Sequence, residues 1–396
     1  MGNKRLVVTA AGAIINFSIG ILYAWSVLAD GLIKELGWSR AEAMLPYTIE
    51  LFTFSMATML GGRFQDRFGP RRAVFISGLF SGLSLIICGL SAAPAGVALG
   101  FGIGFGASAA FSYSSVTPAV LKWFPPGRRG LATGIVLMSL GVSALVWAPV
   151  INYFMARLGV LNTFIAGGIL LMVVMMSASL AISVPSGSEA AGVAASKTAA
   201  IDESENWRNI VRKPSFRTLW LILGLTSGIG LMFVGQLVQM AEFGFGVSWG
   251  YLLVSLFALA NALGRLGGGL CCDRFGYAKT MYLSFAVMFI SLVLFFGGWN
   301  PVFLVAGTAF IGLSYGSLYT VFPAAVAALF GLKNFGVNYG MVFTGLGLIG
   351  SLFPFFSAYL AETTGSYNLT YMIGLLTVVI CLVLVNKLNR DLKYSF

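Results

Sequence analysis

The segment "NALGRLGGGLCCDRFG" (residues 261–276) places a permanent cation, Arg265, inside a stretch that is otherwise apolar. The preceding residues, "WGYLLVSLFALA", put about three helical turns of apolar sequence in front of this arginine. An arginine at the centre of a bilayer costs about 3 kcal/mol on insertion scales, so it must face a water-filled cavity or a partner. The segment therefore predicts a membrane-spanning helix with a special role for Arg265.

The composition of the whole chain agrees with a membrane protein. Of the 396 residues, 58% are hydrophobic and only 9% are charged, and the mean hydropathy is +0.90. A soluble protein of this size has about 25% charged residues. The fold class predicted is therefore all-α, a polytopic protein built from transmembrane helices.

Apolar stretches of about 20 residues, the length needed to cross a bilayer, occur twelve times. One long polar segment separates the sixth stretch from the seventh, so we predict an N-terminal six-helix bundle (1–183), a cytoplasmic linker (184–215) and a C-terminal six-helix bundle (216–396). The predicted spans are 6–28, 41–62, 73–91, 94–121, 131–154, 161–183, 216–240, 249–272, 279–297, 301–330, 337–360 and 368–386.

The basic residues predict the orientation. The net charge is +11, and twenty of the 24 Lys and Arg residues fall on the side that holds both termini and the linker. Basic residues are enriched in cytoplasmic loops, so we expect cytoplasmic termini in a multi-pass protein of the cell (plasma or inner) membrane. This distribution explains the excess of positive charge, and no nucleic-acid partner is expected.

The two halves repeat a sequence pattern. "GGRFQDRFGPRR" (61–72) follows the second span, and "GGLCCDRFGYAK" (268–279) follows the eighth, 207 residues later. Pro118 and Pro323 lie 205 residues apart near the ends of spans 4 and 10. Such a duplication predicts two pseudo-symmetric bundles that rock about a central site near the membrane midplane. The Asp-Arg pairs are predicted to hold a cytoplasmic gate closed: Asp66, Arg67, Asp273 and Arg274.

The Gly-x-x-x-Asp-Arg-x-Gly loop with its basic neighbours resembles the signature loop of the major facilitator superfamily. Three further segments are similar to the oxalate/formate antiporter group and its neighbours, the monocarboxylate (lactate/pyruvate) transporters, which also carry an arginine in span 8. These segments are 20–28 with 37–49 ("GILYAWSVL", "GWSRAEAMLPYTI"), 122–135 ("KWFPPGRRGLATGI") and 338–350 ("NYGMVFTGLGLIG"). The resemblance implies a carrier of small organic anions.

The chain departs from these groups at three places. Leu346 stands where the oxalate carriers have a lysine, which favours a monoanion over a dianion. Asn261, which cannot titrate, stands where animal monocarboxylate transporters have an acidic residue tied to proton coupling. Val27 and Leu28 fill the region of a proton-binding lysine in span 1 of those carriers. The proton route of the resembling family is therefore not expected here.

Arg265 is the predicted substrate ligand, because its planar fork can bind a carboxylate through two parallel hydrogen bonds. The competing interpretation is a structural ion pair with an acid in the membrane. Asn261 lies on the same helix face, four residues away. The other predicted substrate-binding residues, chosen by depth and residue type, are Tyr113, Tyr315, Tyr319, Phe343, Leu28 and Leu140, each with ordinary helix packing as the alternative.

The proton can travel with the substrate or on one of three acids, and the sequence does not choose among Asp30, Glu50 and Glu242. We predict a secondary active transporter of a short monocarboxylate, of the L-lactate or pyruvate type, by proton symport with alternating access. The alternatives are an exchanger of small carboxylates and a carboxylate sensor on a transporter fold. With no histidine in the chain, we expect no enzyme, no catalytic residues, no cofactor and no metal site. The expected partners are the anion, a proton and the lipid bilayer, and the expected functional unit is a monomer.

Overall fold

The computed structural model describes residues 2–124, 129–185, 207–296, 300–330 and 335–393, and every regular element in these ranges is helical. Eleven segments of this described part are long and apolar enough to cross a membrane. Helix α3 (Arg40–Phe68), which occupies the predicted second span, completes the twelve with its 29 residues. The prediction of an all-α protein with twelve transmembrane helices is therefore confirmed.

The chain divides into two compact units, each of which is considered by itself. Unit 1 comprises 1–24, 34–38 and 45–200, and unit 2 comprises 25–33, 39–44 and 201–396. The boundary therefore runs through the end of the first span and the start of the second, in addition to the linker.

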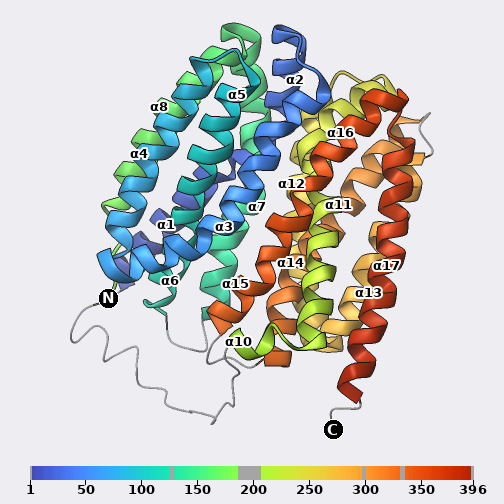
Figure 1. Ribbon diagram of the computed structural model, residues 1–396. Helices are drawn as coiled ribbons and strands as arrows, with labels where there is room; N and C mark the ends of the chain where they lie inside the picture. The colour runs from blue at the N-terminus through green and yellow to red at the C-terminus, as the bar shows by residue number, and fades with distance from the viewer. Residues whose placement is uncertain (1, 125–128, 186–206, 297–299, 331–334, 394–396) are drawn as a thin grey trace. The chain divides into compact units, whose positions relative to one another are not determined.

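Unit 1 is built mainly from the first six spans (Figure 1). Its helices are α1 (Gly2–Ile19), η1 (Gly20–Ala24), most of α3, α4 (Pro70–Gly89), α5 (Pro94–Val97), η2 (Ala98–Phe105), α6 (Gly106–Leu121), α7 (Arg129–Leu158) and α8 (Val160–Ser179). Helices α1 and α7 pack together, as do α4 and α8.

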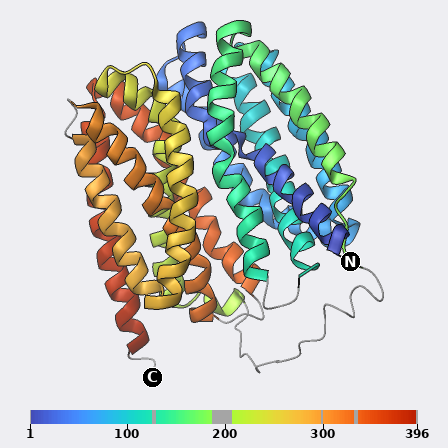
Figure 2. The same cartoon turned by 180° about the vertical axis from the view of Figure 1, so that it is seen from behind.

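Unit 2 is built mainly from the last six spans. Its helices are most of α2 (Trp25–Leu36), then α10 (Trp207–Ile210), α11 (Pro214–Phe245), α12 (Gly250–Phe275), α13 (Tyr277–Phe296), α14 (Pro301–Phe330), α15 (Phe335–Gly345), η4 (Leu346–Gly350), α16 (Leu352–Thr364) and α17 (Asn368–Lys393). Figures 1 and 2 both show α17, in red, running along unit 2 to the C-terminus. The pairings of unit 1 recur here, since α11 packs on η4 and α13 packs on α17, which are spans 7 with 11 and 9 with 12.

The repeated Asp-Arg-Phe-Gly sequence forms the same turn in both units. Gly69 and Gly276 follow α3 and α12 with positive φ angles of 84° and 79°. A side chain in this backbone conformation is strained, so glycine ends each helix before α4 and α13 begin. The arginines of the two turns also repeat one contact: Arg67 lies 5.2 Å from the ring centre of Phe68, and Arg274 lies 5.4 Å from that of Phe275.

A hydrogen-bonded pair of buried serines occurs at corresponding positions in the two units. The hydroxyl of Ser77 in α4 lies 2.5 Å from that of Ser112 in α6, and the hydroxyl of Ser284 in α13 lies 2.8 Å from that of Ser317 in α14. These residues are 207 and 205 apart, the offsets of the two sequence repeats. Hydroxyls that bond across helices contribute to helix association where water is absent. The internal duplication therefore extends from the turns into the packed interior.

Several helices differ in detail from the predicted spans. The first span runs on to Leu36 through a 3-10 turn (η1), and α11 continues to Phe245. Span 4 contains a π-helical stretch, η2, and span 11 contains another, η4, which hydropathy alone does not signal. The predicted linker contains the four-residue helix α10. The linker residues 186–206 lie outside the described residues.

Candidate functional site

Arg265 lies in the middle of α12 and is held by the amide that precedes it by one helical turn. Its Nε donates a hydrogen bond to Oδ1 of Asn261 over 2.9 Å. Asn261 is 1% exposed, and its Nδ2 is buried without a hydrogen-bond partner in the described structure. The guanidinium is therefore fixed at one edge by its own helix, beside a second donor that is available for another acceptor.

Two tyrosines of α14 accompany the guanidinium. The Arg265 guanidinium carbon lies 5.6 Å from the ring centre of Tyr319, within the range of a cation–π contact. The hydroxyl of Tyr315 donates to that of Tyr319 over 3.1 Å. The Tyr315 ring is fully buried and packs beside the ring of Phe257 in α12, with 6.0 Å between their centres. Four of the eight predicted substrate-binding residues thus form one cluster, hereafter the arginine cluster: Asn261, Arg265, Tyr315 and Tyr319.

The other four predicted residues are buried or partly buried. In unit 2, Leu28 is 2% exposed and Phe343 is 7% exposed, the latter next to Tyr339 with 5.8 Å between ring centres. In unit 1, Leu140 is 6% exposed, and Tyr113 packs against Phe54 with 5.5 Å between ring centres. Their roles in substrate binding remain predictions.

The three predicted acids have different surroundings. Asp30 in α2 is partly buried and Glu242 in α11 is exposed, and each takes part in an interaction. Glu50 in α3 is 0% exposed, and neither of its carboxyl oxygens has a hydrogen-bond partner in the described structure. Glu50 is therefore the one acid of these three that is both fully buried and without a hydrogen bond.

The predicted gating residues lie at the two duplicated turns. Arg67, Asp273 and Arg274 are exposed at the ends of α3 and α12, and the side chain of Asp66 lies outside the described residues. Exposed charges at these turns are accessible to other groups, and their role in a gate remains a prediction.

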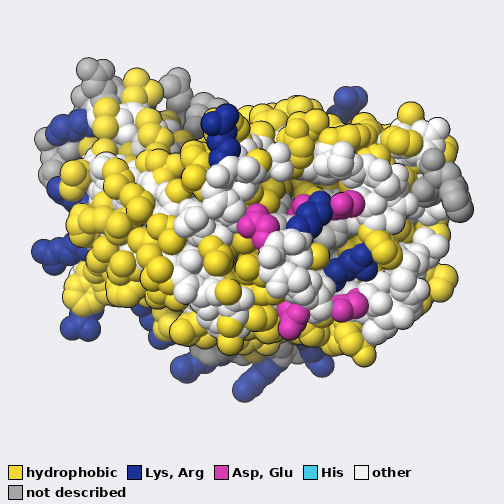
Figure 3. Space-filling view, turned by 90° about the horizontal axis from the view of Figure 1, so that it is seen from above, with side chains coloured by type: hydrophobic (Ala, Val, Ile, Leu, Met, Phe, Trp, Pro, Cys, Tyr) yellow, Lys and Arg dark blue, Asp and Glu magenta, His cyan; other side chains and the backbone are white. Residues whose placement is uncertain are grey.

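Sequence reasoning did not anticipate contacts at the end of unit 2 opposite the C-terminus. The Arg40 guanidinium carbon, near the start of α3, lies 3.8 Å from the ring centre of Phe243 in α11. The backbone N–H of Ala41 donates to the Glu362 carboxylate over 3.3 Å. Figure 3 looks onto this end of the molecule and shows acidic side chains close to basic ones. Arg40 and Ala41 lie in the GWSRAE sequence (37–42), but nothing in that sequence identified their partners.

Two buried glutamines of α11 were also missed. Nε2 of Gln236 donates to the Pro354 carbonyl over 2.7 Å, and Nε2 of Gln239 donates to the Ser26 carbonyl over 3.0 Å. The Oε1 atom of each glutamine is buried without a hydrogen-bond partner in the described structure. The signal was available in the sequence: Gln236 and Gln239 lie four and one residues before the end of the predicted span 216–240. Polar side chains within a membrane span usually face the protein interior.

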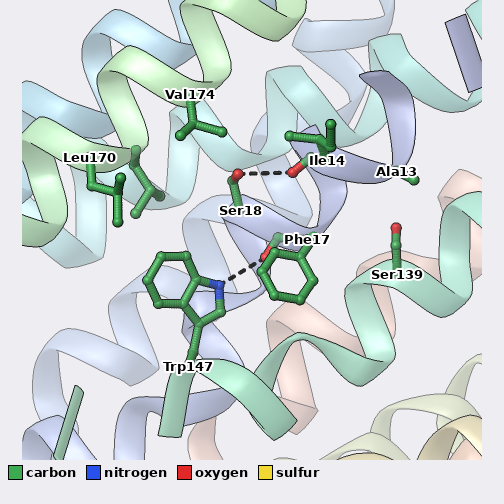
Figure 4. A pocket seen from close by; sticks show the side chains of 9 residues that line it. Ala13, Ile14, Phe17, Ser18, Ser139, Trp147, Leu170 and Val174 are labelled. Carbon is green, nitrogen blue, oxygen red and sulfur yellow. Dashed lines mark hydrogen bonds between the residues drawn. The ribbon is translucent and has the colours of Figure 1, made fainter. Parts of the chain in front are cut away.

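Two of the described cavities are apolar, and no residue of the arginine cluster lines either of them. One in unit 1, of about 410 Å³, lies between α1, α7 and α8 and is lined by residues such as Phe17, Trp147 and Leu170 (Figure 4). Its Trp147 indole N–H donates to the Phe17 carbonyl over 3.0 Å. A second, of about 480 Å³, lies between α11, α16 and α17 in unit 2. None of the predicted substrate-binding residues lines either cavity, so neither is assigned to the substrate.

The chemistry of the arginine cluster suits an anion. Among the described residues there is no group of three or more His, Cys, Asp or Glu side chains that could hold a metal ion. The cluster supplies a guanidinium, an amide N–H and phenolic hydroxyls, all of which donate hydrogen bonds. A guanidinium keeps its positive charge at any physiological pH, so the cluster favours a negative ligand throughout.

Twelve membrane helices in duplicated sets, with a cation held inside one of them, define a protein of the transporter class. Consistent with this, the family model of the major facilitator superfamily matches residues 6–270 and 235–392. The chain belongs to the major facilitator superfamily, whose members are transporters and not enzymes.

Curated relatives cover nearly the whole chain. The oxalate:formate antiporter of Oxalobacter formigenes is 25% identical over 99% of this chain and 94% of its own length. Monocarboxylate transporter 13 of Bos taurus is 23% identical over 90% and 82%. A bacterial homolog of the human lysosomal transporter Spinster, solved in an inward-facing and occupied conformation, shares the fold with a TM-score of 0.71 at 14% identity, over 98% of this chain and 96% of that one.

Proposed function

We propose that the protein is a secondary active transporter of small monocarboxylates of the L-lactate or pyruvate type, and that Arg265 binds the substrate carboxylate. The observation that carries this proposal is the arginine cluster, in which a mid-span guanidinium is oriented by Asn261 and flanked by Tyr319. The relatives that are named for oxalate, formate and monocarboxylates support a small carboxylate as the substrate class.

The geometry suggests how a carboxylate is recognised. With its Nε held by Asn261, the guanidinium presents its terminal nitrogens in a fixed plane, which favours binding of a carboxylate through two parallel hydrogen bonds. The Nδ2 atom of Asn261, which is buried without a hydrogen-bond partner in the described structure, is a donor for the remaining oxygen of a 2-hydroxy or 2-oxo acid. A substrate with this oxygen would satisfy a donor that is costly to leave unpaired.

The second part of the proposal is that the substrate carries a single negative charge. Leu346, which stands where the oxalate carriers have a lysine, is 3% exposed at the start of η4. An apolar side chain cannot pair with a second carboxylate. Replacement of Leu346 with Lys should therefore raise the rate of oxalate uptake relative to lactate uptake, and an unchanged ratio would argue against this part.

Transport is proposed to proceed by alternating access with a proton as the driving ion. The proposed setting is the cell membrane, with both termini on the cytoplasmic side, because twenty of the 24 basic residues lie on that side. The protein is proposed to act as a monomer.

Exchange of two carboxylates is the rival function, and the likeness to the oxalate:formate antiporter over 99% of the chain favours it. An exchanger moves label only against internal substrate, whereas a symporter accumulates substrate in empty vesicles.

Purified protein in sealed liposomes separates these functions. Labelled L-lactate or pyruvate should accumulate in vesicles that hold no substrate when an inward proton gradient is imposed. Uptake that requires internal carboxylate would favour the exchanger, and lactate binding without any flux would favour a sensor. Arg265→Ala should abolish both binding and flux.

A further inference from the structure

Glu50 is an acid buried in the membrane helix α3, and none of the contacts described above accounts for its burial. The residue is 0% exposed, and both carboxyl oxygens are buried without a hydrogen-bond partner in the described structure. Buried polar groups in native proteins are nearly always hydrogen-bonded, and an ionised carboxylate without a partner is far costlier to bury than the neutral acid. Such a group is retained where it has a task.

Helix α3 is closely packed where it carries Glu50. A Cβ atom on Gly106, where α6 begins, would lie 2.9 Å from the Glu50 carbonyl oxygen and 3.2 Å from its Cα. A Cβ on Gly102 in η2 would lie 2.7 Å from Ile49. The two glycines thus let η2 and α6 approach the backbone of α3 closely at the level of the buried Glu50.

The elements around Glu50 offer few charges. Residues 98–121, which form η2 and α6, contain no Asp, Glu, Lys or Arg, and their one titratable side chain is Tyr113. On α3, Tyr47 precedes Glu50 by one turn. The nearest charged residues of this helix are Glu42 and Arg40, about 12 and 15 Å before Glu50 along the axis, and Arg63, about 20 Å after it. Helix α2, which contacts the start of α3 through Trp25, carries Asp30, Lys34 and Glu35, and all three make interactions of their own.

The position of Glu50 also relates it to the predicted substrate residues of unit 1. Phe54, one turn along α3, contacts the ring of Tyr113 with 5.5 Å between ring centres. Glu50 therefore lies one helical turn from Phe54, which contacts the predicted substrate residue Tyr113. A change in the charge of Glu50 occurs close to this contact. Asp30 and Glu242 lack this combination of burial, absence of a hydrogen bond and location.

We propose that Glu50 is the proton-binding site of the transport cycle, an inference that rests on the proposed monocarboxylate symport. One Glu50 oxygen takes up a proton from the loading side, the neutral acid is carried through the conformational change, and the proton leaves on the other side. Arg265 carries one monoanion in the same cycle, so one positive and one negative charge move together. Transport is then electroneutral.

Three measurements on liposomes test this role. The variant Glu50→Gln keeps the shape of the protonated side chain but cannot release a proton. Counterflow of labelled L-lactate at equal pH on both sides should stay within about twofold of wild type. Accumulation driven by an inward proton gradient, and acidification of an internal pH dye when lactate is added, should each fall at least tenfold. The matched controls Glu242→Gln and Asp30→Asn should keep wild-type counterflow, proton-driven accumulation and internal acidification.

The outcomes separate the two proposals. Wild-type protein without counterflow of lactate or pyruvate would refute the proposed function. Wild-type counterflow together with normal proton-driven accumulation in Glu50→Gln would refute the role of Glu50 alone. If Glu50→Gln loses counterflow as well, Glu50→Asp decides: a shifted pH midpoint of counterflow supports the proposal, and an unchanged midpoint overturns it. Accumulation that follows a sodium gradient at constant pH would also overturn it.

Discussion

Helices α3 and α12 are equivalent elements of the two repeats, but the charged side chains within them have opposite signs. Both end in the Asp-Arg-Phe-Gly turn, and the offset of 207 residues pairs Glu50 with Phe257 and Thr58 with Arg265. Thr58 bonds the carbonyl one turn back, that of Phe54, over 2.7 Å. Arg265 bonds the side chain one turn back, that of Asn261. The same backbone thus holds an acid in one half and a cation in the other.

The difference between these helices teaches which features belong to the scaffold and which to the function. The glycine turns and the serine pairs are the same in both units, as structural elements should be. The side chains at mid-helix have diverged in charge, which packing alone does not require. We therefore expect mutations of the diverged positions to alter transport and mutations of the shared positions to alter stability.

The largest effect is expected at the cation of α12. Arg265→Lys keeps the charge but loses the planar pair of donors, and charge-assisted hydrogen bonds contribute about 1.5–3 kcal/mol each. Lactate uptake should fall about 10- to 100-fold with unchanged protein yield. The control is Arg157→Lys, an exposed arginine that also lies over a tyrosine ring, at 4.8 Å from Tyr153. Equal uptake by the two variants would remove Arg265 from the substrate site.

The next effect tests the residue that orients this cation. Asn261→Asp places a carboxylate beside Arg265, where it competes with the substrate for the guanidinium. The Kd for lactate should rise about tenfold, an energy of about 1.4 kcal/mol, and the loss should shrink as the pH falls and the new acid becomes protonated. Titration of purified protein at several pH values measures this. A lower Kd at neutral pH would show that the amide does not hold the cation for an anion.

A smaller effect is expected at the tyrosines of α14. Tyr319→Phe keeps the ring over Arg265 but removes a hydroxyl, and one hydrogen bond contributes about 1 kcal/mol. The KM for lactate should therefore rise about fivefold. Tyr359→Phe, a change at an exposed tyrosine of α16, should leave KM unchanged. A larger loss in Tyr319→Phe than in Arg265→Lys would make the hydroxyl, and not the cation, the main substrate ligand.

The smallest effect on transport is expected at the shared turns. Ala at Gly69 or Gly276 forces a side chain into a backbone conformation that is essentially restricted to glycine, at a cost of about 1–3 kcal/mol. Each variant should lower the Tm by a few degrees, and the two should do so about equally. Gly267→Ala, inside α12 with no atom near the added methyl, should not lower it. Unequal losses at the two turns would mean that the repeats are not structurally equivalent.

Much of the fold was predictable because hydropathy and the duplicated turn are local signals. The lengths and the number of the helices follow from the apolar stretches that a bilayer requires. The 207-residue repeat follows from the duplicated Asp-Arg-Phe-Gly sequence. The helix ends were less predictable: α2 and α11 continue to Leu36 and Phe245, beyond the predicted spans. The π-helical stretches η2 and η4 leave no hydropathy signal at all.

The arginine cluster was predictable where it depends on helical periodicity. Asn261 with Arg265, and Tyr315 with Tyr319, are each four residues apart on one helix, so their contacts follow from spacing. The choice among the three acids was not predictable, because burial and hydrogen bonding depend on neighbours distant in sequence. Glu50 is distinguished from Asp30 by its full burial and by a carboxyl group without a hydrogen-bond partner in the described structure.

The repeated serine pair has a consequence for the energetics of the cycle. Each bond joins helices within one unit, Ser77 with Ser112 and Ser284 with Ser317, and so can persist in every conformation that leaves the units intact. An interaction that is equally strong in two states cannot shift the equilibrium between them. These hydrogen bonds thus stabilise all conformers equally. Their loss would lower the stability of one helix bundle without shifting the equilibrium between the conformations of the carrier.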